Sequence, residues 1–256
     1  MTKLKEKPLS EKIIEAVTIE DVKQLKLLIA QSKNSIDYNE ALNLAAFKGS
    51  IECVKLLIPL SDQKTNNSQA LGWASRNGHA ECLKLLIPVS NPKDNESEAL
   101  RLASSNGHTE CVKILIPISD PKTNNSEILR QASLNGQTEC VKLLIAVSNS
   151  KSNKCRALIW ASIYGHAECV KLLIPVSNPK FNNSQALQRA SFYNHQDCVK
   201  LLLPHSDISS WNEEDWPIIN FDMQQIIKSY YSKISLTQNV LPNINQTSKP
   251  KKLHKI

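Results

Sequence analysis

The chain repeats itself with a period of 29 residues, and this period constrains its fold more than any other feature. Six cysteines and six alanines keep the interval, and so do five glycines, with Asn194 in the sixth glycine position. The positions are Cys53, Cys82, Cys111, Cys140, Cys169 and Cys198; Ala45, Ala74, Ala103, Ala132, Ala161 and Ala190; and Gly49, Gly78, Gly107, Gly136 and Gly165. Chance does not hold three residue types in phase for six cycles, so the chain is predicted to consist of repeated structural units.

One unit, residues 97–125, predicts two short helices joined by a tight turn. Ser97 is expected to cap the first helix, because its hydroxyl can accept a hydrogen bond from an unpaired backbone N–H. Gly107 ends that helix, since glycine tolerates the left-handed backbone that the turn requires. The second helix carries the apolar residues of 111–116, and Pro117, which has no N–H, marks its end. A turn-rich connector leads to the next unit.

The phase can be followed outward from the six strong units. An earlier unit has Glu20 in the glycine position and Gln24 in the cysteine position, which is typical of a polar terminal repeat. After Pro204 the pattern decays, although Asp215-Trp216-Pro217 resembles a helix start and 223–231 reads as a final helix. We therefore expect an all-α fold, an α-solenoid of about seven helix-turn-helix repeats plus a degenerate C-terminal cap.

Charge divides the chain into a neutral body and two basic ends. The net charge is +7. Residues 1–12 carry +2 and residues 233–256 carry +5, so residues 13–232 are neutral. A neutral body argues against a long surface that follows nucleic-acid phosphates. We expect a basic N-terminal segment at 1–9, the solenoid at 10–235, and a basic, disordered tail at 236–256.

The sequence favours the cytoplasm, with a host cytosol or nucleus as alternatives. The sequence has no run of about 18 apolar residues, so no membrane span is expected. The N-terminus is too polar for a secretory signal. Equivalent helices in neighbouring repeats are expected about 8–10 Å apart, too far for a disulfide between their cysteines. Seven unpaired cysteines suit a reducing compartment. Cys155, in the cap position that serine holds elsewhere, is the expected reactive thiol.

The helix-turn-helix half of each unit resembles the ankyrin-repeat family. Residues 74–87, with Leu83 in place of Val, are similar to the family's Ala-Ala-x-x-Gly-His-x-x-Ile-Val-x-x-Leu-Leu. The resemblance covers about residues 10–232, in units shorter than the family's repeat of about 33 residues. The family's Thr-Pro-Leu-His motif keeps only its Leu, and the missing residues come from the connector. The resemblance implies a protein-binding solenoid with shortened fingers, like expanded ankyrin sets of some microbes and viruses.

The sequence gives little support for a metal site, an enzyme active site or a cofactor site. His-x-x-Cys pairs, such as His79 with Cys82, recur once per repeat, and zinc ligands spread in this way cannot converge on one ion. The chain has no Gly-x-Ser-x-Gly, no His-Glu-x-x-His and no phosphate-binding glycine loop. We therefore expect no enzyme, no cofactor, no metal and no small-molecule substrate.

Positions that vary between repeats are free to bind a partner, and the resemblance places them on the concave side. Arg76, Arg101 and Arg130 are expected to form a basic strip in the first half of the solenoid. An aromatic patch is expected in the second half from Ile163, Tyr164, Phe192 and Tyr193, with Trp160 as a candidate further member; Arg189 also lies on a first helix. Arg, Trp and Tyr dominate interface hot spots. Trp160 has an alternative interpretation as inter-repeat core.

Two functions remain open. The leading hypothesis is a non-catalytic scaffold that binds another protein on its concave face, as a microbial or viral inhibitor or effector would, or as an adaptor. The partner is expected to offer an acidic segment followed by an apolar anchor. The alternative is nucleic-acid or anionic-surface binding through the basic C-terminal tail.

Overall fold

The computed structural model describes residues 7–32, 36–61, 67–119, 125–148, 151–209, 211 and 221–238. In these residues the chain forms fifteen α-helices and four short 3-10 helices, with no β-strand. Seven antiparallel helix pairs follow one another, and a single long helix comes last. The predicted all-α solenoid of seven repeats with a C-terminal cap is confirmed.

Each repeat contributes a first helix to one row and a second helix to another. The first helices are α1 (Leu9–Thr18), α3 (Asn39–Lys48), α5 (Asn67–Asn77), α7 (Asp94–Ser105), α9 (Asn125–Leu134), α11 (Lys151–Ile163) and α13 (Phe181–Phe192). The second helices are α2 (Val22–Gln31), α4 (Ile51–Leu57), α6 (Ala80–Leu86), α8 (Thr109–Leu115), α10 (Thr138–Val147), α12 (Ala167–Leu173) and α14 (Gln196–Leu202). The last helix, α15, spans Phe221–Gln238.

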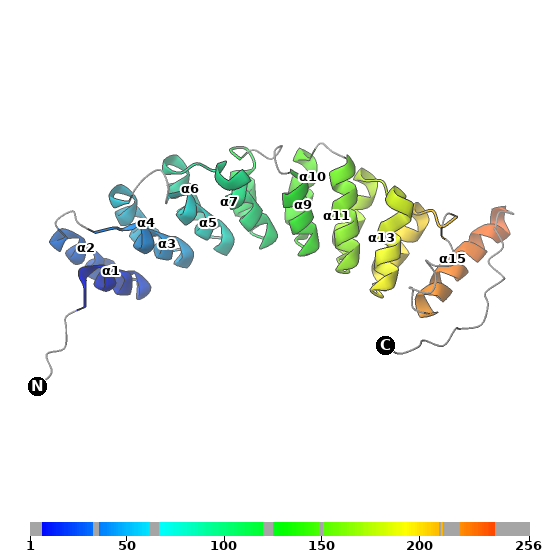
Figure 1. Ribbon diagram of the computed structural model, residues 1–256, viewed down its shortest axis with the longest axis horizontal. Helices are drawn as coiled ribbons and strands as arrows, with labels where there is room; N and C mark the ends of the chain where they lie inside the picture. Colours follow the sequence, from blue (N-terminus) through cyan, green and yellow to red (C-terminus); the bar gives the residue numbers. More distant parts are fainter. Residues whose placement is uncertain are drawn as a thin grey trace, which may run out of the picture.

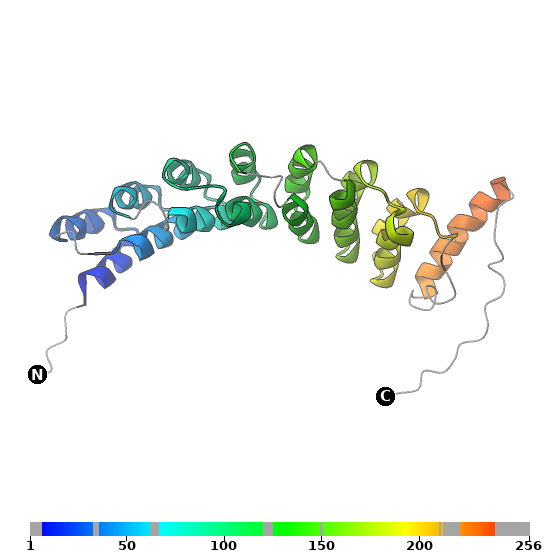
Figure 2. The ribbon, with the colours of Figure 1, turned by 45° about the horizontal axis from the view of Figure 1, so that its top comes forward.

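The two rows give the molecule a curved shape. Figure 1 shows the first helices along the inner, concave side, and Figure 2 shows the second helices as a separate outer row. Within each row every helix packs on its neighbour, α3 on α5 and α4 on α6 for example. A solenoid of this kind presents an extended concave surface for binding.

The turn inside each repeat explains why alanine, glycine and histidine stay in phase. Gly78 has φ +77°, which ends α5 in a left-handed turn. The next N–H, that of His79, then donates to the carbonyl of Ala74 at 2.9 Å. Asn194 and Glu20 occupy the same position with φ 64° and φ 57°. The prediction that Asn194 replaces glycine in this turn is therefore confirmed.

The histidines join each turn to the preceding repeat. His79 Nε2 lies 2.9 Å from the carbonyl oxygen of Phe47 and His108 Nε2 lies 2.8 Å from that of Arg76. A carbonyl only accepts, so Nε2 carries the proton and donates. The imidazole ring also covers the preceding glycine: a Cβ on Gly78 would lie 2.8 Å from Cε1 of His108.

In the first repeat the glycine is replaced, and the histidine that would cover it is replaced as well. Glu20 has a side chain at the turn, and the residue that takes the histidine position after it is Ser50. A serine leaves room where an imidazole ring would not.

Proline ends the second helix, as predicted. Prolines of four repeats lie in 3-10 helices: η1 (Ile58–Leu60), η2 (Ile87–Val89), η3 (Ile174–Val176) and η4 (Leu203–His205). In the fifth repeat Ala146 takes the proline position, and α10 continues as α-helix to Val147. The absence of proline explains the longer helix, because alanine keeps the backbone N–H that donates to the helix.

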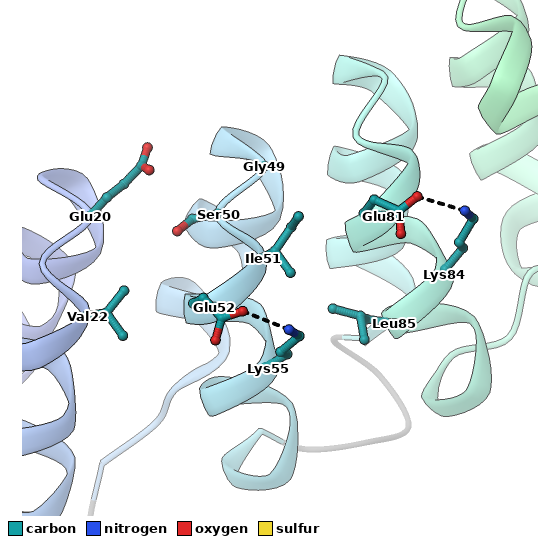
Figure 3. A pocket seen from close by; sticks show the side chains of 10 residues that line it. All are labelled: Glu20, Val22, Gly49, Ser50, Ile51, Glu52, Lys55, Glu81, Lys84 and Leu85. Atoms are coloured by element: carbon teal, nitrogen blue, oxygen red, sulfur yellow. Dashed lines mark hydrogen bonds and ion pairs between the residues drawn. The ribbon is translucent and has the colours of Figure 1, made fainter.

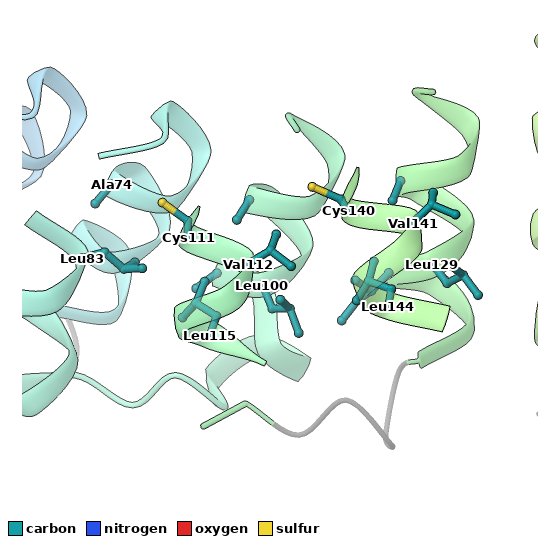
Figure 4. Close-up of a cluster of buried hydrophobic side chains, with 14 of the residues drawn as sticks. Ala74, Leu83, Leu100, Cys111, Val112, Leu115, Leu129, Cys140, Val141 and Leu144 are labelled. Atoms are coloured by element: carbon teal, nitrogen blue, oxygen red, sulfur yellow. The ribbon is translucent and has the colours of Figure 1, made fainter. Parts of the chain in front are cut away.

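The core runs along the whole solenoid between the two rows. Figure 4 shows its central part, in which Leu100, Val112 and Leu115 point into the layer shared with the next repeat. These side chains are completely buried, and the cysteines beside the valines are buried too. Burying one such aliphatic side chain stabilises the fold by about 1.5–3 kcal/mol. The six in-phase thiols therefore act as small apolar residues.

The serine position at the start of the first helices has a different role from the predicted cap. The predicted cap at Ser97 is wrong: α7 begins at Asp94, and Ser97 itself has φ 65°. In two repeats the serine hydroxyl at this position accepts a hydrogen bond from the connector of the following repeat. Ser184 Oγ accepts from the N–H of Asp207 at 2.8 Å, and Ser68 Oγ accepts from that of Asn91 at 3.4 Å.

The described connectors are plain turns. Asn91 Oδ1 accepts from the N–H of Lys93 at 3.1 Å, and Asn178 Oδ1 accepts from that of Lys180 at the same distance. Such Asx turns fix the backbone without a β-hairpin. The predicted helix start at 215–217 lies outside the described residues, as does the tail beyond Gln238; the final helix expected at 223–231 lies within α15.

We predict that Gly78→Ala destabilises the protein, because alanine strains the left-handed turn by about 1–2 kcal/mol and its methyl group displaces His108. Urea denaturation measures the change. The double variant Gly78→Ala/His108→Ser should lose less stability than the two single changes add up to.

Gly72→Ala is the matched control, because Gly72 lies inside α5 and its added Cβ would meet only Leu102 Cδ1 at 3.5 Å. This change should stabilise the helix by roughly 0.5–1 kcal/mol. Equal stability of wild type and Gly78→Ala would contradict the account.

Candidate protein-binding surface

The first half of the concave row carries one exposed arginine beside two aromatic rings. Phe47 and Trp73 meet edge to face with centroids 5.6 Å apart, and the guanidinium of Arg76 lies 5.6 Å from the Trp73 ring. Trp73 also packs against the core. Arg76 is exposed, and its contact with Trp73 orients its side chain by a cation–π interaction.

The other two arginines of the expected strip are bound to carboxylates of their own helices. Arg101 lies 3.4 Å from Glu98. Arg130 holds Glu127 with two hydrogen bonds, of which the one from Nε measures 2.8 Å. The hydrogen bond from Arg130 holds the pKa of Glu127 below its usual value. The strip is therefore less positive than three arginines suggest.

Arg130 of repeat five lies over a stack of rings in repeat six. Its guanidinium lies 5.1 Å from the centroid of Trp160, across the boundary between α9 and α11. Trp160 stacks on Tyr164 at 6.2 Å, and Tyr164 stacks on His166 at 6.4 Å. His166 in turn lies 2.8 Å from the carbonyl of Leu134. The stack is thus tied to the preceding repeat at both ends.

Repeat seven has the same stacking of a tyrosine on a histidine. Phe192 and Tyr193 meet edge to face at 4.8 Å, and Tyr193 stacks on His195 at 6.4 Å. Tyr164, Phe192 and Tyr193 have exposed fractions of 50%, 45% and 47%. Trp160 is half-buried, and Arg189, one turn before Tyr193, is exposed. Aromatic rings held in place and half in water are typical of interface anchors.

Comparison with known proteins identifies the repeats. A family model of ankyrin repeats matches in three copies, at residues 13–95, 88–153 and 129–212. The chain belongs to the ankyrin-repeat family. None of the curated proteins compared with the chain matches it.

Two solved ankyrin-repeat domains have similar folds. The ankyrin-repeat domain of human ASB11 superposes with a TM-score of 0.61 at 24% identity, covering 77% of this chain and 98% of that one. The ankyrin-repeat domain of Bcl-3, described as a unique member of the IkappaB protein family, gives 0.58 at 20% identity, covering 74% and 97%. Ankyrin repeats are generally protein-interaction modules, and the fold is typically a non-catalytic scaffold.

A groove on the outer side of the first three ankyrin repeats has a volume of about 640 Å³. Figure 3 shows Glu20, Ile51 and Leu85 around it, with the ion pairs Glu52–Lys55 and Glu81–Lys84 on its walls. The hydrogen bond from Lys55 lowers the pKa of Glu52. A general acid needs a raised carboxyl pKa, so Glu52 is not suited to that role.

The His-x-x-Cys pairs do not form metal sites where the structure describes them. His79 faces a backbone carbonyl of the preceding repeat, whereas Cys82 is buried in the core. In the described part of the chain, no three His, Cys, Asp or Glu side chains are grouped to hold an ion. No described helix is long and apolar enough to cross a membrane.

The expectation of a reactive thiol at Cys155 is wrong. Its exposed fraction is 3%, and its Sγ accepts from the N–H of Asn178 at 3.3 Å. Cys155 therefore does what Ser184 does one repeat later, binding the next connector. Thiolate reactivity needs access to solvent, which this position lacks.

Sequence reasoning missed the contact between Arg130 and Trp160. The two positions are 30 residues apart, one more than the period, so the repeat offered a signal that they lie on adjacent helices. The pairing of Arg130 with Glu127 had a plainer signal, the i,i+3 spacing on one helix.

We predict that the protein loses stability as the pH rises from about 9 to about 11. Burial raises the pKa of the Cys82, Cys111 and Cys198 thiols from 9.0 to about 11. A group whose folded pKa is raised stabilises the fold below its unfolded pKa and ceases to do so above its folded pKa. Urea denaturation at a series of pH values measures the loss.

Cys111→Ala is the control, because lysines also titrate in this range. The variant should lose less stability than the wild type between the two pH values. Parallel curves for the two proteins would show that the thiol is not the cause.

Proposed function

We propose that this chain is a non-catalytic ankyrin-repeat scaffold that binds another protein on its concave face. The observation that carries the proposal is the pair of aromatic clusters at the carboxyl ends of α11 and α13. Tyr164 and Tyr193 occupy equivalent positions of adjacent repeats, are half exposed, and are held by stacking on histidines. Rigid aromatic side chains lose little entropy on binding, so they favour tight contacts.

The binding residues proposed are those of both halves of the concave row. Repeats six and seven supply the anchors, and the arginines supply orientation and on-rate rather than most of the affinity. The set is Arg76, Arg101, Arg130, Trp160, Tyr164, Arg189, Phe192 and Tyr193. A scaffold of this kind acts by covering the partner's surface, as an inhibitor or effector of microbial or viral origin would, or by presenting it as an adaptor.

The proposed location is the cytoplasm, or a host cytosol or nucleus. All seven cysteines are unpaired and buried. Such thiols persist in a reducing compartment.

We predict that Tyr164→Ala/Tyr193→Ala weakens partner binding by more than about 1 kcal/mol, roughly fivefold or more, while the thermal unfolding midpoint stays the same. Affinity purification with mass spectrometry supplies the partner, and titration calorimetry measures the affinity. The rings are half exposed, so their loss removes little core packing.

Ile19→Ala is the matched control. Ile19 is 66% exposed and holds the same repeat position in the first repeat as Tyr164 and Tyr193 hold in theirs. Its replacement should leave the affinity unchanged. Unchanged affinity in the double tyrosine variant would refute the proposed surface.

The second candidate function is binding of an anionic partner by the basic tail, which lies outside the described residues from position 239 on. The favouring observation is the charge of +5 in residues 233–256. We predict that deleting 245–256 leaves partner binding intact. If instead binding to duplex DNA, measured at several salt concentrations, is steeply salt-dependent and disappears with the deletion, the tail is the functional element.

A further inference from the structure

The charges on the concave row change sign along the solenoid. One position of the first helices is acidic in four of the first five repeats and then becomes basic. The residues at this position are Glu11, Glu40, Gln69, Glu98, Glu127, Arg156 and Gln185. The helices α11 and α13 contain no aspartate or glutamate at all.

Because of this change, two arginines of the last repeats have no carboxylate partner among the described residues. Arg101 and Arg130 each bind a glutamate three residues earlier on their own helix. Arg189 has Ala186 three residues earlier and Gln185 four residues earlier, and Arg156 itself occupies the glutamate position. Both side chains are exposed, and among the described residues neither makes an ion pair.

The two arginines share a surface with the aromatic anchors. Arg156, Trp160 and Tyr164 follow at i, i+4 and i+8, which places them along one side of α11. Arg189 and Tyr193 have the same spacing on α13, and Arg189 holds the repeat position of Trp160. Since α11 packs directly on α13, cations and rings alternate over one patch.

Resting on the proposed function, we propose that this patch binds an acidic peptide segment that carries a bulky apolar side chain, supplied by the partner protein. The patch consists of Arg156, Trp160, Tyr164, Arg189, Phe192 and Tyr193. Unpaired guanidinium groups bind carboxylates in a planar, bidentate geometry, and the exposed rings receive the apolar side chain. In the part of the chain that the structure describes, Arg156 and Arg189 hold no carboxylate that an incoming one would have to displace.

A peptide fits the patch better than a nucleic-acid strand does. Phosphate binding along a strand needs a continuous track of cations. On this row the track of cations is interrupted at α9 and α7, because Glu127 and Glu98 neutralise Arg130 and Arg101. The glutamates of the first repeats would repel a strand that continued past the patch.

Selection from a random peptide library displayed on phage, on the immobilised full chain, tests the proposal without knowledge of the partner. We expect enriched peptides to combine several Asp or Glu residues with a Phe, Leu or Trp. The variant Arg156→Glu/Arg189→Glu should not select them. An enriched peptide made with a fluorescent label should bind this variant at least tenfold more weakly than wild type by fluorescence anisotropy.

The control Lys23→Glu/Lys26→Glu makes the same change in net charge on α2, where both lysines are exposed, and should keep the wild-type affinity. Circular dichroism confirms that all variants are folded. Selection of peptides without excess acidic residues, or failure to enrich any peptide, overturns the proposal. So does tighter binding of labelled oligothymidine that depends on the same two arginines.

The two levels of hypothesis fail separately. If a purified partner loses affinity in Tyr164→Ala/Tyr193→Ala but not in Arg156→Glu/Arg189→Glu, the protein-binding surface stands and the acidic segment is wrong. If neither variant affects the partner, both are wrong.

Discussion

The contact between each turn and the histidine of the next repeat is the constraint on which the solenoid depends. A left-handed glycine lets the chain reverse between the two helices of a repeat, and the imidazole ring of the following repeat lies against it, as His108 lies against Gly78. The same ring donates to a carbonyl at the end of the preceding first helix. The same glycine–histidine contact therefore serves both the reversal of the chain and the stacking of repeats. A side chain in the glycine position disturbs both.

This constraint explains which positions can vary. Buried alanine, leucine, valine and cysteine fill the layer between rows, and their size is set by the distance between neighbouring helices. The outward positions of the first helices have no such requirement, so they differ from repeat to repeat. Glu127 and Arg156 occupy one of these positions in adjacent repeats. A repeat protein acquires a specific binding surface because its charged and aromatic side chains differ from one repeat to the next.

The candidate surface combines rigidity with exposure. Stacking on His166 and His195 fixes two tyrosines that still present about half of their area to solvent. Because those histidines also belong to the turns, the anchors are supported by the same contacts that hold the repeats together. The turn contacts therefore support the tyrosines, whereas the histidines bind the preceding repeat without help from the tyrosine rings.

The seven helix pairs, the turn at Asn194 and the burial of the six in-phase cysteines follow from the amino-acid sequence alone, because period, turn chemistry and core size are local or repeated properties. Contacts with a neighbour in the next repeat became visible only in the three-dimensional structure. In that structure Cys155 is buried against a connector, and Arg130 lies over Trp160. Such contacts join residues about one period apart, and the direction of a side chain between two repeats cannot be derived from either repeat alone.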